Sequence, residues 1–253
     1  MKLVSLIIPA FNEAASIGAT LREALNYFER RGTALEIIVA ADGADGTREV
    51  CRLISETRRE VQVTGQTERR GKGRGIRNAV GMASGDVIGF IDADNKTPIA
   101  EFDKFAHHLN DGCAIAIGSR ALNGSSIERP QPAYRQLGSW GFGIFMHACV
   151  GLNQIADTQC GFKFFRGDVA RELFRLQQID GYMFDVEILY LAQQLGYEIV
   201  EVPVRWRDDG DSRLQLLSGN LRNVLDIVSI RWRHRVLVRA MANGTAAQQP
   251  SQF

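Results

Sequence analysis

The stretch VIGFIDADNKTP, residues 87–98, joins a short apolar run to two aspartates that are separated by one alanine. Short apolar runs bounded by glycine and proline are typical of buried strands, so residues 87–91 are predicted to form one. Side chains alternate along a strand, which places Asp92 and Asp94 on the same side at its end. Two carboxylates this close repel each other, and a bound cation would relieve the repulsion.

The same strand signal recurs on both sides of this stretch, in alternation with helical patterns. Strands are predicted at LVSLIIP, LEIIVA, VQVTG, DVIGFI and CAIAIG, and helices at residues 17–30, 45–58, 75–83 and 99–110. This rhythm predicts an α/β fold, with a mostly parallel sheet and helices on both faces. Ligands of such sheets bind beyond the carboxyl ends of the strands, where Asn12, Glu13, Asp42 and the two aspartates would converge.

The pattern changes after Ser119. A polar loop is predicted at residues 120–135, followed by an apolar helical segment, a strand at DTQCGFKFF, a helix at FDVEILYLAQQLG and a strand at EIVEVPVRW. We expect residues 1–212 to form one domain with two halves, 1–118 and 119–212. Residues 213–241 read as a basic amphipathic helical segment, and the polar residues 242–253 as a disordered tail.

Composition limits the compartment and the partners. The chain has 253 residues, a net charge of +1 and four cysteines without metal-binding spacing, which indicates a reducing cytoplasm and no structural zinc. The N-terminal apolar run is short and is predicted to be a strand rather than a signal peptide. No stretch reaches the roughly 20 apolar residues of a membrane span, so any membrane contact would be peripheral. A nucleic-acid partner is not expected, because the basic C-terminal segment lacks interleaved aromatic residues beyond Trp232.

Two familiar phosphate motifs fail on residue identity. The segment GKGRGIRNAVG matches neither GxxxxGK[ST] nor GxGxxG, because Ile76 occupies the last required glycine. The phosphatase pattern DxDxT fails because Lys96 stands at its fifth position. A solvated strand end remains an alternative for Asp92 and Asp94, but paired carboxylates suit hard cations such as Mg²⁺ or Mn²⁺.

Four segments in sequence order carry a family resemblance: SLIIPAFNEAASI, IIVAADGADGT, RRGKGRGIRNAVGMASGDVIGFIDAD and IGSR. Together they resemble the family 2 glycosyltransferases with the GT-A fold, over residues 3–120. The resemblance implies a nucleotide-sugar donor, with Asp92 and Asp94 holding Mg²⁺ or Mn²⁺ on its diphosphate. Ala41 stands where the family has a first aspartate, which leaves base selectivity open. The donor-binding residues implied are Pro9, Asn12, Glu13, Asp42, Lys72, Asp92 and Arg213.

The second half narrows the resemblance. The segments DTQCGFKFFRGDVA, GYMFDVEILYLAQQLGYEIVEVPVRW and SRL resemble polyprenyl-phosphate sugar transferases; the dolichyl-phosphate β-glucosyltransferases are nearest and the mannosyltransferases more distant. Lys96 departs from the glutamine of the mannosyl relatives. The resemblance implies inverting transfer of a sugar, with UDP-glucose favoured and GDP-mannose as the alternative, to a polyprenyl or dolichyl phosphate. It implies acceptor-binding roles for Arg120, Arg135, Asp157 and Gln159, and catalytic roles for Asp92, Asp94, Asp157 and Arg135.

Two other functions stay open from the residues. A family 2 transferase acting on a glycan hydroxyl would need a carboxylate base, for which Asp157, Asp185 and Glu187 are candidates. A nucleotide-sugar-binding scaffold without turnover is the non-enzyme alternative. Cys160 is expected to be a small buried residue rather than a nucleophile, since no histidine pattern accompanies it.

The C-terminal segment predicts a site of membrane contact. Its apolar residues recur at helical spacing and arginines surround them, as in helices that lie on anionic lipid surfaces. We therefore expect peripheral association with the inner face of the membrane; the alternative is a core-packing helix with a solvated basic end. The apolar positions are Leu214, Leu217, Leu221, Val224, Leu225 and Val228.

Overall fold

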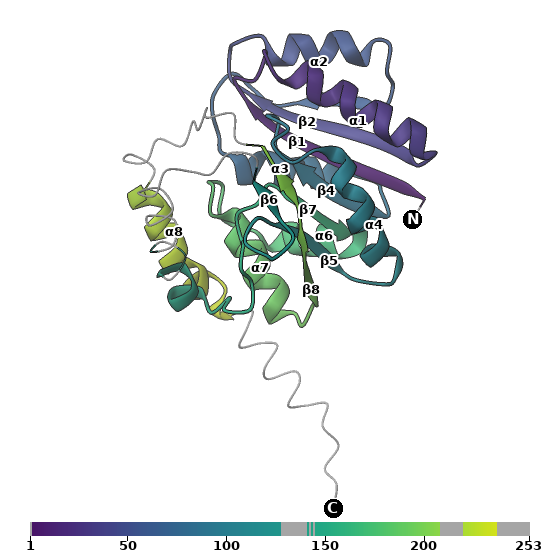
Figure 1. Ribbon diagram of the computed structural model, residues 1–253. Coiled ribbons are helices and arrows are strands. Elements are labelled where there is room, and N and C mark those ends of the chain that lie inside the picture. Colours follow the sequence, from purple (N-terminus) through teal and green to yellow (C-terminus); the bar gives the residue numbers. More distant parts are fainter. Residues whose placement is uncertain (1, 128–140, 142, 144, 208–219, 237–253) are drawn as a thin grey trace, which may run out of the picture.

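The computed structural model describes residues 2–127, 141, 143, 145–207 and 220–236. A seven-stranded sheet runs through the centre in the order β3-β2-β1-β4-β7-β5-β8 (Figure 1). Strand β7 is antiparallel to β4 and β5, and the other pairs are parallel, so the predicted mostly parallel sheet is confirmed. The strands are β1 (Leu3–Phe11), β2 (Ala34–Asp42), β3 (Val61–Thr64), β4 (Val87–Ile91), β5 (Ile115–Ser119), β7 (Phe162–Arg166) and β8 (Ile199–Pro203).

Helices cover both faces of the sheet, as the alternating pattern predicted. Alternate strand residues point to opposite faces: in β1, Ile7 packs on the side of α3, while Leu6 and Ile8 pack on the side of α1. One face carries α1 (Ile17–Arg31), α2 (Thr47–Ser55), a 3₁₀ turn (Ile99–Glu101) and α4 (Phe102–Asn110). The other carries α3 (Lys72–Met82), α6 (Gly167–Leu176) and α7 (Phe184–Gln194), with α8 (Asn220–Arg233) packed against α7.

The strand register determines which residues meet at one edge. Phe11 and Asp42, the last residues of β1 and β2, are directly paired. Ile91, the last residue of β4, is paired with Phe162, the first residue of β7. Because β7 is antiparallel, the segment before it reaches the edge where the parallel strands end. Loops from both halves of the chain therefore meet at that edge.

Two predicted strands are only partly right. In DTQCGFKFF the strand begins at Phe162, because the polar residues before it form a loop whose groups are bound by other side chains. EIVEVPVRW is interrupted after Pro203: the Val204 N–H still donates to the Ser119 carbonyl of β5 (3.2 Å), but the Val204 carbonyl accepts from the N–H of Ser126 (3.3 Å). Its last part, β9 (Arg205–Trp206), pairs with β6 (Ser126–Ile127) in a separate small sheet.

No helix in the described ranges is long and apolar enough to cross a bilayer. Of the C-terminal segment that the sequence predicted to be helical, the structure describes α8 and the three residues that follow it.

Candidate functional site

The ends of β1 and β2 interlock through an asparagine and a glycine. Asn12 has a left-handed backbone (φ 56°), and a Cβ on Gly43 would overlap its side-chain amide. The Asp42 carboxylate accepts hydrogen bonds from the N–H groups of Gln66 (3.3 Å) and Arg70 (2.9 Å), which holds the loop before α3 at the same edge. The structure thus brings the predicted donor residues at the ends of β1 and β2 into one region.

Glu13, the next predicted donor residue, is held at the start of α1. Its N–H donates to the Thr47 hydroxyl (2.8 Å), and its carboxylate accepts from the Ser16 hydroxyl (2.6 Å). These bonds tie the turn after β1 to the first residue of α2.

The paired aspartates lie as the alternation predicted. Ala93, between them, packs in the core on the α1 side, and its carbonyl accepts a hydrogen bond from Thr20 (2.7 Å). The side chains of Asp92 and Asp94 remain 41% and 35% exposed. Burial, and then the neighbouring Asp92 carboxylate, raise the pKa of Asp94 above its ordinary value. The predicted conflict between two like charges is therefore present.

Each aspartate has a lysine beside it. Lys72 Nζ lies 2.6 Å from Asp92 Oδ1, and Lys96 Nζ lies 3.4 Å from Asp94 Oδ2. Burial alone would lower the pKa of Lys72, but the carboxylates of Asp92 and Asp185 outweigh it and raise that pKa. Lys72 therefore stays charged at the edge of the sheet.

The carboxylate oxygens of Asp92 and Asp94 suit a cation that a phosphate ligand also coordinates. Within the part of the chain that the structure describes, no three or more His, Cys, Asp or Glu residues form a group that could hold a metal ion. Two carboxylates are too few for an all-protein cage. They match Mg²⁺, which keeps several waters and binds through one or two carboxylates together with substrate phosphates. Asp92 and Asp94 therefore fit such an ion.

The glycine-rich stretch positions Lys72 rather than cradling a phosphate. A Cβ on Gly71 or Gly73 would overlap backbone carbonyls of residues 179–180. The N–H groups of Gly73 and Arg74 donate to the carbonyls of Gly181 (3.3 Å) and Asp180 (3.2 Å). The N–H groups of the second and third residues of α3 are thus occupied by protein, in agreement with the failed nucleotide-loop match.

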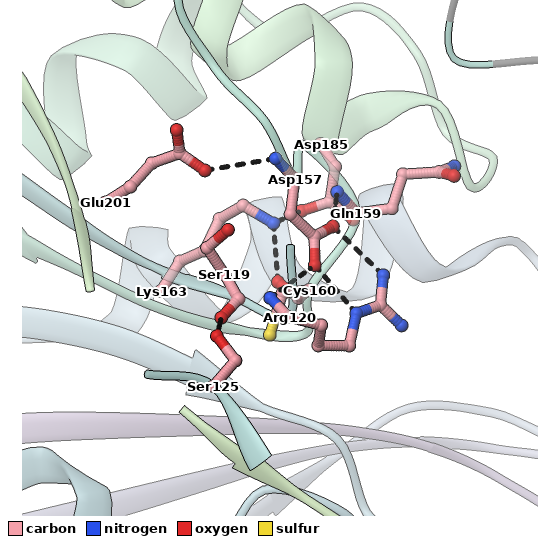
Figure 2. A network of polar contacts seen from close by, with 9 residues as sticks. All are labelled: Ser119, Arg120, Ser125, Asp157, Gln159, Cys160, Lys163, Asp185 and Glu201. Carbon is pink, nitrogen blue, oxygen red and sulfur yellow. Dashed lines mark hydrogen bonds and ion pairs between the residues drawn. The ribbon is translucent and has the colours of Figure 1, made fainter. Parts of the chain in front are cut away.

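The Asp157 carboxylate is held by hydrogen-bond donors of Arg120 and Gln159 (Figure 2). Arg120 donates to it from Nε (2.7 Å), Nη2 (3.0 Å) and its backbone N–H (3.0 Å), and Gln159 donates from its N–H (3.1 Å). Burial raises the pKa of Asp157, but the Arg120 guanidinium outweighs burial and the pKa is lowered. Glu201 of β8 fixes the same loop by accepting the N–H groups of Ala156 (2.8 Å) and Asp157 (3.0 Å).

A second, buried ion pair contacts the same loop at the Cys160 carbonyl. Lys163 Nζ contacts Asp185 Oδ1 (2.7 Å) and the Cys160 carbonyl (2.6 Å), and the two charged side chains are 1% and 6% exposed. Burial raises the pKa of Asp185, although Lys163 opposes the shift. Burial also raises the pKa of the Cys160 thiol to about 11, which agrees with the predicted buried, unreactive role.

Gly161 joins the two halves of the site and is not among the residues predicted from the sequence. The Asp92 N–H donates to its carbonyl (3.1 Å), and a Cβ at this position would overlap the Asp92 carboxylate. Lys163 and Glu201 are also not among the predicted residues. A lysine enclosed by phenylalanines in FKFF was the signal that could have revealed the buried ion pair.

Two cations of the site lie over one indole ring. The Arg120 guanidinium and Lys96 Nζ are 5.5 Å and 5.8 Å from the centre of the Trp206 ring. With Nε and Nη2 bound to Asp157, Arg120 keeps Nη1 for another acceptor, and its side chain is 31% exposed. Arg135 and Arg213, the other predicted phosphate-binding arginines, lie outside the described residues.

We expect Lys163→Met to lower the free energy of unfolding by about 3–5 kcal/mol, because it removes the cation in direct contact with the buried Asp185 carboxylate. Without Lys163 the pKa of Asp185 would rise further, so the folded protein would take up a proton that the unfolded chain does not. The loss should therefore be smallest in acid and grow as the pH rises.

Urea unfolding at about pH 5 and about pH 8 measures this loss. Arg166→Met is the matched control, since it removes an exposed ion pair with Asp168 and should cost about 1 kcal/mol or less. Replacing both partners, Lys163→Met with Asp185→Leu, should recover much of the stability. Equal losses for Lys163→Met and the control would contradict the prediction.

The chain is similar to known proteins over most of its length. The chain is 34% identical over 238 residues to a dolichyl-phosphate β-glucosyltransferase of Trichomonas vaginalis, covering 89% of this chain and 70% of the relative. The human dolichyl-phosphate β-glucosyltransferase is 34% identical over 251 residues, covering 92% and 76%.

Solved structures show the same fold at lower identity. A glucosyl-3-phosphoglycerate synthase of Mycobacterium tuberculosis, solved with Mn²⁺, UDP and glucosyl-3-phosphoglycerate, matches with a TM-score of 0.66 and 20% identity, covering 91% of this chain and 80% of that one. A mannosyl-3-phosphoglycerate synthase of Rubrobacter xylanophilus matches with a TM-score of 0.65 and 21% identity, covering 92% and 75%. The fold is GT-A. The family Glycosyl transferase family 2 matches residues 5–174, and the chain belongs to this family of glycosyltransferases.

Proposed function

We propose that the protein transfers glucose from UDP-glucose to a polyprenyl or dolichyl phosphate, with inversion at the sugar's anomeric carbon. The names of relatives that share about a third of their residues over most of the chain support transfer of glucose and a dolichyl phosphate acceptor. The chemistry of the site supports it independently, through the state of its carboxylates.

One observation supports the proposal most directly. Each of the three carboxylates that could act as a base already binds other groups of the protein. Asp157 accepts four hydrogen bonds and its pKa is lowered, which makes it a poor proton acceptor. Asp185 is buried against Lys163. Glu187 is fully buried and accepts the N–H groups of residues 178 and 179. A hydroxyl acceptor needs a base, whereas a phosphate oxygen is already anionic near neutral pH.

The reaction balances without a protein base. An oxygen of the acceptor phosphate forms a bond to the anomeric carbon, while the bond from that carbon to the β-phosphate oxygen breaks. UDP leaves with the electron pair, and the products are the glucosyl ester of the lipid phosphate and UDP. Negative charge grows on the leaving diphosphate, so the main task of the site is electrostatic.

The donor would bind where β1, β2 and β4 end. Asp42 and Asn12 would face the nucleoside, and Lys72 would face the diphosphate. Mg²⁺ or Mn²⁺ held by Asp92 and Asp94 would supply neutralising charge at that diphosphate. The Mn²⁺ and UDP in the mycobacterial fold neighbour support this class of cofactor and donor.

The acceptor phosphate would bind at Arg120, on the side of Lys96 and Trp206. A guanidinium offers paired donors for phosphate oxygens, and Asp157 fixes its orientation by holding one edge. Gln159, whose N–H also donates to Asp157, belongs to the same loop. Because such an acceptor stays in its bilayer, the protein would work from the cytoplasmic side as a peripheral membrane protein.

Incubation of radiolabelled UDP-glucose with a short polyprenyl phosphate, and separately with the corresponding polyprenol, tests the proposal. Label should enter the organic phase only with the phosphate, and GDP-mannose should be the poorer donor. Transfer to the alcohol or to glycans, with none to the phosphate, would overturn the proposal. No transfer to any acceptor, with UDP-glucose still bound, would favour the scaffold alternative.

A further inference from the structure

Helix α8 exposes a continuous apolar line on the side away from the core. Nine large apolar side chains are strongly exposed in the described part of the chain, and five of them belong to α8 and the residues just after it. Their spacing of three and four residues places them on one helical stripe. Exposed apolar residues on a soluble monomer are usually scattered singly. The stripe consists of Leu221 (71% exposed), Leu225 (60%), Val228 (56%), Trp232 (64%) and Val236 (71%).

The opposite side of α8 is locked to the catalytic domain. Ile227 and Ile230 are fully buried, and His234 is 2% exposed. His234 Nε2 lies 2.7 Å from Oε1 of Glu187 on α7. Rotation of α8 would break this buried pair, so the stripe cannot turn inward to hide its side chains.

The Glu187–His234 pair also connects α8 to the donor side of the site. Glu187 accepts the N–H groups of Gln178 (2.9 Å) and Ile179 (2.8 Å) as well as pairing with His234. The carbonyls of the next two residues accept the N–H groups at the start of α3, which carries Lys72. A chain of hydrogen bonds therefore links the helix that carries the stripe to the helix that carries Lys72.

Arginines border the apolar line. Arg222, Arg231 and Arg235 are exposed, and the Arg235 guanidinium lies 5.0 Å from the centre of the Trp232 ring. Asp226 is partly buried and pairs with Arg233 (4.0 Å) rather than facing outward with the stripe. Apolar side chains with flanking arginines and a tryptophan match the boundary between lipid headgroups and acyl chains.

We propose that this stripe is the docking surface for an anionic phospholipid bilayer, with α8 lying in the plane of the membrane. Two copies of the chain packed through the stripe would bring their arginines together, which disfavours a dimer. The proposal draws on the proposed function only for the lipid nature of the acceptor.

Flotation of the full chain with lipid vesicles, without nucleotide, tests the docking. We expect binding to vesicles of phosphatidylcholine with phosphatidylglycerol and much weaker binding to phosphatidylcholine alone. Leu225→Ser with Val228→Ser should weaken the partition about tenfold, since each change removes buried apolar surface. Leu53→Ser is the control, because Leu53 is similarly exposed (65%) but lies on α2.

Arg231→Gln tests the contribution of charge to vesicle binding. It should weaken binding to anionic vesicles about fivefold and leave binding to neutral vesicles unchanged. Trp232 provides a direct readout, since its fluorescence should shift to the blue with anionic vesicles and not in the Trp232→Leu variant. Unchanged flotation of the double variant would overturn the docking surface. So would a double variant that changes only the oligomeric state by light scattering.

Failure of docking and failure of the proposed function give different results. Transfer to a water-soluble, short-chain polyprenyl phosphate without vesicle binding would refute the docking surface and support the proposed function. Vesicle binding that requires the stripe, without transfer to any polyprenyl phosphate, would support the docking surface and refute the proposed function.

Discussion

Replacement of Asp94 by asparagine is expected to lower kcat/KM for sugar transfer about a hundredfold to a thousandfold, the range found when one preorganised electrostatic group is removed. The side chain keeps its shape, so the loss would come from charge alone. Asp94 is partly exposed at the carboxyl edge of the sheet, beside Asp92 and Lys96. Excess chelator should abolish transfer by the unaltered protein, and Mn²⁺ or Mg²⁺ should restore it.

The contribution of the Asp94 charge to metal binding can be measured without turnover. Mn²⁺ binding, observed by electron paramagnetic resonance in the presence of UDP, should weaken in Asp94→Asn. Asp111→Asn is the matched control, since it neutralises an exposed aspartate at the end of α4 that pairs with His107. Full transfer in excess chelator, or equal Mn²⁺ binding by Asp94→Asn and the control, would refute a metal role for this pair.

The carboxyl edge of the sheet could be predicted because it depends on local patterns. Alternation along a strand places Asp92 and Asp94 on one side, and parallel pairing brings the ends of β1, β2 and β4 together. Both inferences need only the strand signals and the usual topology of βαβ units. The structure places Asn12, Asp42 and the aspartate pair accordingly.

The second half of the site could not be predicted in the same way, because its contacts are not local. Apolar periodicity does not distinguish a parallel from an antiparallel strand, so the sequence did not reveal that β7 brings Gly161 against Asp92. A lysine in a strand usually faces water, whereas Lys163 is buried because Asp185 arrives from α7. Such pairs become visible only when the packing is known.

Helix α8 has one apolar face that packs on the core and a second apolar face that is exposed. Ile227 and Ile230 pack on the core, as in the core-packing alternative, while Leu221, Leu225 and Val228 of the predicted apolar set face outward. Helical spacing alone did not separate these two apolar faces, because both recur at the same period. Membrane contact stays a prediction.

Arg120→Gln is expected to lower kcat/KM for the lipid phosphate about a hundredfold or more, because charge-assisted hydrogen bonds of about 1.5–3 kcal/mol each would be lost. The affinity for UDP-glucose, measured by calorimetry, should change little, which also shows that the variant is folded. Arg166→Gln is the matched control, since Arg166 is exposed and pairs only with Asp168 among its described partners. An equal loss of donor affinity in Arg120→Gln would contradict an acceptor role for Arg120.

Asp157→Asn separates positioning of Arg120 from base catalysis. The amide keeps an oxygen for one Arg120 N–H but loses the charge and the second acceptor, so the KM for the lipid phosphate should rise while kcat falls much less. A base lost from a hydroxyl mechanism would instead collapse kcat. The pH profile gives a second readout: transfer should rise through about pH 6, where a phosphate monoester loses its second proton, and this limb should persist in Asp157→Asn. If kcat collapses and the limb disappears together, Asp157 is the base and the acceptor is a hydroxyl.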